Sequence, residues 1–194
     1  MGEVVHLDAA GPAGVVAWLE TPDDARRGGL VMICEDGPAS DEVRALAAAF
    51  AAVGYETLAP ALFYENAAWN DIARDVCAAV SALAAPVFVM GWGGWGGAAA
   101  WLAACRVAGV AAVSACDGAR IAELVSEAPT APIILHFGVD QRPAPAALIG
   151  AIGEAHPDIP MHLYDAMERS GAARLAHLRD LRLFALNGVG RGDF

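Results

Sequence analysis

The sequence contains no lysine, and its 12 basic residues are outnumbered by 23 acidic ones. The formal net charge is −11, and the isoelectric point lies near 4.7. A surface with this charge repels polyanions, which argues against DNA or RNA as a partner. We therefore expect no nucleic-acid partner and consider a small molecule as the ligand class.

Cysteine is scarce, and no two of the four cysteines form a Cys-x-x-Cys pair. That absence argues against zinc knuckles and thioredoxin-like motifs, so we expect no metal site. The first residues also lack a basic segment followed by an apolar core, which a secretory signal requires. The expectation is a reduced, cytoplasmic protein.

Charge is absent from residues 76–105, a stretch long enough to span a bilayer. Pro86 and the glycines between Gly91 and Gly97 interrupt it, and its first part is mostly the weakly apolar alanine. A helix, a strand, a turn and a second helix explain this pattern better than a membrane span.

The length of 194 residues is typical of one domain, and we expect a single domain over 1–194. Along the chain, apolar runs alternate with helical patterns. This alternation predicts βαβ units and a doubly wound, mostly parallel sheet, with the functional residues at the carboxyl ends of its strands. Strands are expected at 3–7, 15–20, 28–34, 55–59, 87–90, 110–114, 133–137 and 161–164. Helices are expected from Ser40 or Asp41 to Gly54 and at about 69–84, 96–106, 119–127, 144–155 and 172–186.

Glycines gather between the strand expected at 87–90 and the helix that follows. Gly91, Gly93 and Gly96 form a Gly-x-Gly-x-x-Gly pattern, and Asp117 follows 21 residues after the last of them. This spacing matches a dinucleotide site, in which backbone N–H groups hold a pyrophosphate and the acidic residue binds a ribose.

Two observations count against the dinucleotide interpretation. Only 77 residues follow Asp117, and the side chains of Trp92 and Trp95 would crowd the loop that must approach the phosphates.

The same glycines also fit a nucleophile elbow, in which the attacking residue projects from a strained strand-to-helix turn between two glycines. Counting from Gly91 places Gly93 at the nucleophile position, whereas counting back from the Gly96–Gly97 pair places Gly94 there. Neither residue has a side chain that attacks a carbonyl group.

Three segments occur in an order and at spacings that resemble a known family. Residues 30–65 combine a strand, a glutamate-containing loop, a helix, a Gly-Tyr pair and a Pro-Ala-Leu-Phe-Tyr run. Residues 131–145 contain a strand followed by Gly-Val-Asp, and residues 161–171 read MHLYDAMERSG. Together they resemble the dienelactone hydrolase branch of the α/β-hydrolases. The resemblance covers nearly the whole chain and implies a sheet of about eight strands, including an edge hairpin.

The resemblance implies a catalytic triad of cysteine or serine, aspartate and histidine. Asp140 stands at the position of the acid, and Gly93 or Gly94 at that of the nucleophile. Arg169 stands at the position of the histidine, and arginine stays protonated, so it is no base at neutral pH. We expect Asp140 and Arg169 to form a salt bridge, and we expect the triad hydrolysis of esters and lactones to be lost.

Other members of the predicted site follow from the same resemblance. Glu35 would lie near the nucleophile position, and Asp36 would lend its backbone N–H to an oxyanion hole. The second N–H would come from Gly94 or Trp95. An acidic residue, Glu65, stands where relatives that bind carboxylates have a basic one, which argues against an anionic lactone. The remaining candidate residues are Tyr64, Trp92 and Trp95, and the tryptophans would either line a ligand pocket or fill the space of a missing lid.

Alternatives from the residues themselves stay open. Cys34 and Cys116 each end a predicted strand, so either is a relocated nucleophile, with Glu35 as base, or a buried apolar filler. Asp117 caps a helix if it binds no ribose. His136 and His162 are expected in the core, and His156 in solvent.

Three hypotheses for function result. The first is a dienelactone-hydrolase-like protein without triad activity that binds a small ligand or a partner, with no cofactor. The second is an active hydrolase with an unconventional cysteine, and the third is a dinucleotide-binding protein. The loss of the nucleophile and the histidine favours the first hypothesis over the second, and the order of motifs favours both over the third.

Overall fold

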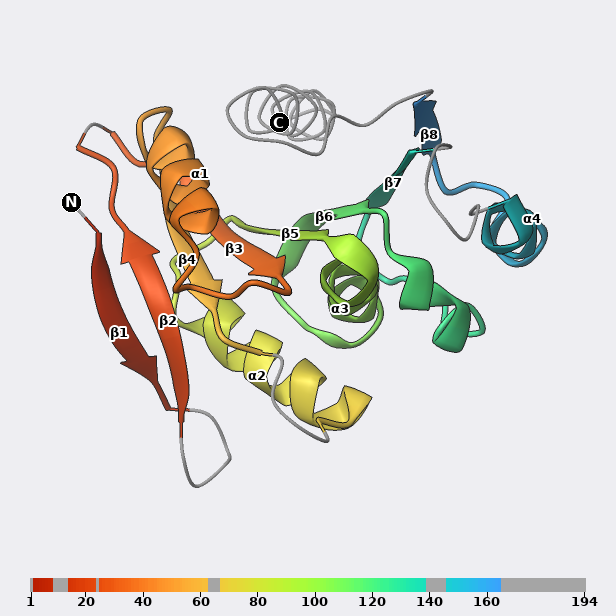
Figure 1. Ribbon diagram of the computed structural model, residues 1–194, viewed down its shortest axis with the longest axis horizontal. Helices are drawn as coiled ribbons and strands as arrows, with labels where there is room; N and C mark the ends of the chain where they lie inside the picture. Colours follow the sequence, from red (N-terminus) through yellow and green to blue (C-terminus); the bar gives the residue numbers. More distant parts are fainter. Residues whose placement is uncertain (1, 9–13, 24, 63–66, 139–145, 165–194) are drawn as a thin grey trace.

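The described residues form one eight-stranded sheet with helices on both faces (Figure 1). The computed structural model describes residues 2–8, 14–23, 25–62, 67–138 and 146–164. The strands are β1 (Glu3–Leu7), β2 (Val15–Glu20), β3 (Gly28–Cys34), β4 (Tyr55–Pro60), β5 (Val87–Trp92), β6 (Val110–Cys116), β7 (Ile133–Gly138) and β8 (Met161–Tyr164).

Strand order across the sheet is β1-β2-β4-β3-β5-β6-β7-β8. The β1–β2 hairpin is antiparallel, and β2 also pairs antiparallel with β4. All other neighbouring strands are parallel. The expected fold class, a mostly parallel sheet of about eight strands with an edge hairpin, is therefore confirmed.

Apolar side chains divide between the two faces of the sheet because successive residues of a strand point to opposite sides. In β5, Val87 and Val89 join the larger core cluster, whereas Met90 and Trp92 join the smaller one. The helices are α1 (Asp41–Ala51), against the smaller cluster, and α2 (Trp69–Ser81), α3 (Gly93–Arg106) and α4 (Ala146–Ala155), against the larger one.

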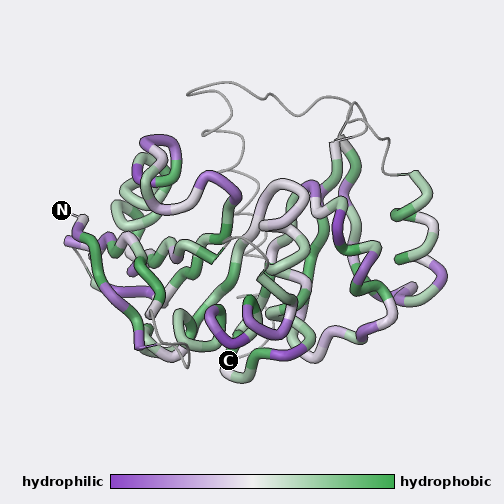
Figure 2. The backbone as a smooth tube through the Cα atoms, turned by 60° about the horizontal axis from the view of Figure 1, so that its bottom comes forward, coloured by the Kyte–Doolittle hydropathy of each residue, from purple (hydrophilic) through white to green (hydrophobic). Residues whose placement is uncertain are grey.

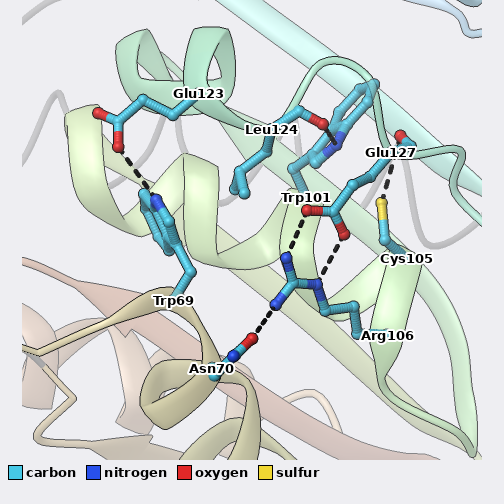
Figure 3. A network of polar contacts seen from close by, with 8 residues as sticks. All are labelled: Trp69, Asn70, Trp101, Cys105, Arg106, Glu123, Leu124 and Glu127. Carbon is cyan, nitrogen blue, oxygen red and sulfur yellow. Dashed lines mark hydrogen bonds and ion pairs between the residues drawn. The ribbon is translucent and has the colours of Figure 1, made fainter.

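Helix α3 is the most deeply buried helix of the described chain, with nine buried residues along one continuous run. Its small residues let its backbone approach β5 and β6 closely. Trp101 is fully buried between α3 and the segment around Leu124. The Trp101 indole N–H donates to the Leu124 carbonyl oxygen at 3.2 Å (Figure 3). The uncharged stretch 76–105 thus becomes the end of α2, β5 and nearly all of α3, as expected. Within the described ranges, no helix combines the length and the apolar character that crossing a membrane requires.

The helix expected at 119–127 is wrong. A short 3-10 helix, η1, covers only Ala119–Glu123, and turns follow it. The carbonyl groups of Leu124 and Glu127 instead accept hydrogen bonds from the side chains of Trp101 and Cys105 on α3. These hydrogen bonds to distant residues therefore outweigh the local preference of this segment for a longer helix.

Other element boundaries also differ from expectation. Helix α2 ends at Ser81, three residues early, while β5 and β6 each continue two residues further, to Trp92 and Cys116. Helix α3 begins at Gly93 rather than near residue 96. Ser40 occupies the N-cap of α1, but its side chain makes no capping hydrogen bond.

The buried hydroxyl group of Ser114 in β6 leads to a prediction about stability. The Ser114 side chain is 6% exposed, and its hydroxyl oxygen has no hydrogen-bond partner in the described part of the chain. An unsatisfied buried hydroxyl costs about 1–3 kcal/mol, so Ser114→Ala should leave the free energy of unfolding unchanged or raise it. Leu135→Ala in the neighbouring strand, at a fully buried position, should lower it by about 2–5 kcal/mol. Urea unfolding of both variants checks this, and a Ser114→Ala loss as large as that of Leu135→Ala would contradict it.

Candidate functional site

The turn between β5 and α3 lies at the carboxyl edge of the sheet and depends on close backbone contacts. A methyl group added at Gly91 would overlap the Gly96 carbonyl oxygen and lie 2.9 Å from the Ala100 Cβ. One added at Gly96 would lie 2.6 Å from the Ile33 carbonyl oxygen. These glycines therefore let α3 start directly against β3 and β5.

Gly93 is the residue at which the chain changes direction. Its φ is +81°, in the left-handed region, while Trp92 before it is extended and α3 starts at Gly93 itself. In a nucleophile elbow, the residue at the strand-to-helix turn has a φ of this kind, which is strained only where that residue carries a side chain. Of the two positions that the sequence left open, Gly93 is thus the one with elbow geometry, whereas Gly94 already lies in the helix.

The Glu35 carboxylate lies over this turn. Its Oε1 accepts a hydrogen bond of 2.7 Å from the Trp95 backbone N–H. The same oxygen would lie 3.3 Å from a Cβ at Gly93 and 3.4 Å from a Cβ at Gly94. A carboxylate is favourable there because the first N–H groups of a helix carry partial positive charge. Of the two N–H groups expected as oxyanion-hole donors, those of Gly94 and Trp95, the Trp95 N–H is therefore engaged by Glu35. Gly94 is the residue that follows Gly93.

The two tryptophans of the turn point to opposite sides of the sheet. Trp92 is buried in the smaller core cluster with α1, whereas Trp95 packs against the larger cluster. Trp92 and Trp95 therefore do not line one pocket together. The contacts of Trp95 instead involve residues of α2 and η1.

Trp95 belongs to a cluster that joins α2, α3 and η1. Its ring lies 5.3 Å from that of Trp69, and the Arg120 guanidinium lies 3.3 Å from the centroid of the Trp95 ring. Glu123 accepts hydrogen bonds from Arg120, at 2.6 and 2.8 Å. It also accepts one from the Trp69 indole N–H, at 3.0 Å (Figure 3). This cluster fixes the first turn of α3 and, with it, the Trp95 N–H.

A second polar group ties the far end of α3 to the same loop. Arg106 donates to both carboxylate oxygens of Glu127 and, at 2.6 Å, to the Asn70 side chain (Figure 3). The Arg106 hydrogen bond lowers the pKa of Glu127, and the Arg120 hydrogen bond lowers that of Glu123. Burial raises the pKa of the Cys105 thiol to about 12, so Cys105 is an unreactive thiol.

Asp117 has a role that the sequence did not indicate. Its φ is +54°, and its carboxylate accepts a hydrogen bond of 2.9 Å from the Gly138 N–H. Its own N–H donates to the His136 carbonyl oxygen at 2.8 Å. Asp117 thus links the carboxyl ends of β6 and β7. The expectation of a helix cap is wrong, because Gly118 is the residue before η1 and no side chain caps it.

Other predicted residues divide between the core and the surface. Cys34 and Cys116 end β3 and β6, and both are buried. His136 is fully buried, as expected, whereas His162 is half-buried.

His156 was expected in solvent but is half-buried, because its ring packs edge-on against Trp101 and forms a hydrogen bond of 2.6 Å with the Val125 carbonyl oxygen. Asp36 lies in an exposed turn after β3.

Three predicted site residues, Tyr64, Asp140 and Arg169, lie outside the described residues, and so does the proposed salt bridge between the last two. The described residues contain no group of three or more histidine, cysteine or acidic side chains arranged for a metal ion.

The fold and the turn together define the class: the chain has the α/β-hydrolase fold in the form found in dienelactone hydrolases and esterases. A Klebsiella pneumoniae subsp. pneumoniae structure assigned as a dienelactone hydrolase superposes with a TM-score of 0.77 at 15% identity, over 95% of this chain and 97% of that one. Est1E from Butyrivibrio proteoclasticus superposes with a TM-score of 0.74 at 12% identity, over 97% and 99%.

The dienelactone hydrolase from Anabaena variabilis superposes with a TM-score of 0.72 at 18% identity, over 94% of each chain. The sequence itself matches no known family model and no curated protein. At these identities the structures establish the fold, and the resemblance read from the motif order is confirmed at that level.

Two glycines of the turn differ sharply in the room around them, which gives a matched pair of variants. Gly91→Ala should prevent folding or lower the melting temperature strongly, because the new methyl group overlaps backbone. Gly94→Ala should leave it unchanged or raise it, because the nearest atom is 3.4 Å away and alanine favours helix by up to about 1 kcal/mol. Thermal unfolding measures both, and equal effects would contradict this account of the turn.

The Arg106–Glu127 pair predicts a pH dependence. The folded-state pKa of Glu127 is lowered, so the pair stabilises the fold above the unfolded-state pKa of about 4.3 and stops doing so as the pH falls through the folded value. Arg106→Met should lower the melting temperature by a few degrees at neutral pH, and the difference should vanish well below pH ~4.

Arg27→Met is the matched control, because Arg27 forms no ion pair with the described residues. A difference between Arg106→Met and wild type that persists in acid would show that lost packing, rather than lost charge pairing, is responsible.

Proposed function

We propose that this protein is a dienelactone-hydrolase-like scaffold that has lost triad hydrolysis and binds a small molecule at the glycine turn. The observation that carries the proposal is the Gly93 turn, which has the backbone geometry of a nucleophile elbow but no nucleophile. The known structures with this fold include esterases and dienelactone hydrolases, and ester or lactone hydrolysis is the chemistry that the turn would otherwise serve.

Glu35 also supports the loss of hydrolysis. An oxyanion hole stabilises negative charge with N–H groups that point to where the charge develops. With Gly93 at the elbow position, the N–H that follows it belongs to Gly94. The Glu35 Oε1 lies 3.4 Å from a Cβ built at Gly94 while accepting a hydrogen bond from the next N–H, that of Trp95. A developing oxyanion beside Gly94 would be repelled by this carboxylate.

The same contact argues against the dinucleotide hypothesis. A pyrophosphate would need the N–H groups at the start of α3, where Glu35 places a negative charge. Asp117, the expected ribose ligand, uses one carboxylate oxygen to bind the Gly138 N–H. Both acidic groups therefore serve the fold at the positions where the cofactor would bind.

Steady-state hydrolysis is the direct test. Purified protein is assayed with activated aryl esters and a dienelactone, beside the Cys34→Ser and Cys116→Ser variants. We expect wild-type turnover no faster than buffer, because no described residue at the turn is a nucleophile. Turnover that disappears in one cysteine variant would instead establish the second hypothesis, an enzyme with a relocated thiol.

Binding at the turn is tested separately, by ligand-observed NMR with a library of small uncharged fragments. Gly94→Leu fills the space over the turn, and Gly94→Ala is the control that leaves most of it open. Fragments that bind wild type and Gly94→Ala but not Gly94→Leu are expected. Fragments that bind all three proteins equally would place the ligand elsewhere.

A further inference from the structure

A row of five side chains crosses the sheet near its carboxyl edge, on the face opposite to the one that α3 covers. The residues are consecutive neighbours in register from β3 to β8. Side chains of paired residues in a sheet project to the same face, so this row lies on the face that carries α1. Its members are Cys34, Trp92, Cys116, His136 and His162.

Within the row, Cys116 and His136 are partners in register on β6 and β7. Their strands lie about 4.8 Å apart, a spacing that side chains of this length bridge. Both residues are 0% exposed. The His136 ring stacks on that of His162, with centroids 5.5 Å apart and planes 18° apart. A thiol next to an imidazole is the arrangement that activates cysteine as a nucleophile.

Ser114 adds a polar group to the same face. It lies two residues before Cys116 on β6, so both side chains project to one side of the sheet. Its hydroxyl oxygen, buried and without a hydrogen-bond partner in the described part of the chain, is able to bond a polar atom of a guest molecule.

We propose that Cys116 and His136 form a nucleophilic pair that captures a small uncharged α,β-unsaturated carbonyl compound. The Cys116 sulfur bonds to the β-carbon as the carbon–carbon double bond becomes single. The thiol proton passes to His136 and then to the α-carbon, and the Ser114 hydroxyl donates to the carbonyl oxygen. Nothing leaves and nothing is oxidised, so the adduct contains all atoms of both reactants.

Burial and charge define the electrophile. Both reactive side chains are fully buried, which restricts capture to small molecules, and the net charge of −11 disfavours anions. The pair does not include the glycine turn, so the proposal is independent of the proposed function. Ester turnover and stoichiometric thiol addition are different measurements, and either proposal can fail alone.

Cys34 is an internal control within the same row. It is 2% exposed, close to the burial of Cys116, but its neighbour in register is Trp92 rather than a histidine. Folded wild-type protein is treated with acrylamide, a small uncharged electrophile of the proposed class, across a pH series. Peptide mass spectrometry then follows each cysteine separately, and exposed Cys77 reports the ordinary thiol.

At pH 7 we expect Cys116 to react at least tenfold faster than Cys34. Its rate should also depend less steeply on pH than that of Cys77, because His136 accepts the thiol proton during the addition. Equal rates for the two buried thiols would overturn the proposal. So would a Cys116 rate that rises with pH in parallel with that of Cys77, since transient opening of the fold alone would produce it.

His136→Gln tests the imidazole directly. It should reduce the Cys116 rate to that of Cys34 and leave the Cys34 rate unchanged, whereas an undiminished Cys116 rate would overturn the proposal. A Cys34 rate that rises in this variant would show that the substitution unfolds the protein. In that case, the ratio of the Cys116 rate to the Cys34 rate in wild-type protein decides whether Cys116 is activated.

Discussion

Close contact between the backbone of α3 and the central strands is the constraint on which the rest of this structure depends. Gly91 and Gly96 touch, and Gly96 lies against the Ile33 carbonyl group, so the first turn of α3 has no room for side chains on its inner side. This contact sets where β5 ends, turns Gly93 into the left-handed region and presents the Trp95 N–H to Glu35. The aromatic and ionic cluster around Arg120 then fixes the outer side of the same turn. A change in the glycines would therefore alter the fold and the candidate site together.

Much of the fold could be predicted from the sequence, because its signals are local. The uninterrupted apolar run Gly28–Cys34 and the alternation of strands and helices are enough to predict a parallel sheet. The errors arose where distant contacts outweigh local preference. Residues 119–127 have a helical pattern, yet carbonyl groups there bond side chains of α3 instead of continuing a helix. The exact ends of strands likewise depend on neighbours that a local pattern does not contain.

The candidate site was predictable in composition but not in arrangement. The sequence alone shows that Gly93 and Gly94 carry no nucleophilic side chain, and the order of motifs predicted that Glu35 lies near them. No local pattern indicates that Trp92 and Trp95 enter opposite clusters, or that Asp117 joins two strands. His136 looked like an ordinary core residue, and only the strand register reveals Cys116 beside it. The parallel pairings of this sheet connect residues that are 20 or more positions apart, which is why reasoning from local sequence patterns does not find them.

The left-handed φ of Gly93 has an evolutionary consequence. A nucleophile with a side chain at such a position stores strain of about 1–3 kcal/mol, which an enzyme tolerates for the sake of activity. Glycine adopts the same φ at no steric cost, so a hydrolase that exchanges its nucleophile for glycine becomes more stable as it loses its reaction. The stability gained in this way increases the number of further substitutions that the chain can accept without unfolding. On the proposed loss of hydrolysis, a turn with glycine at this position is therefore a tolerant starting point from which a binding function can diverge.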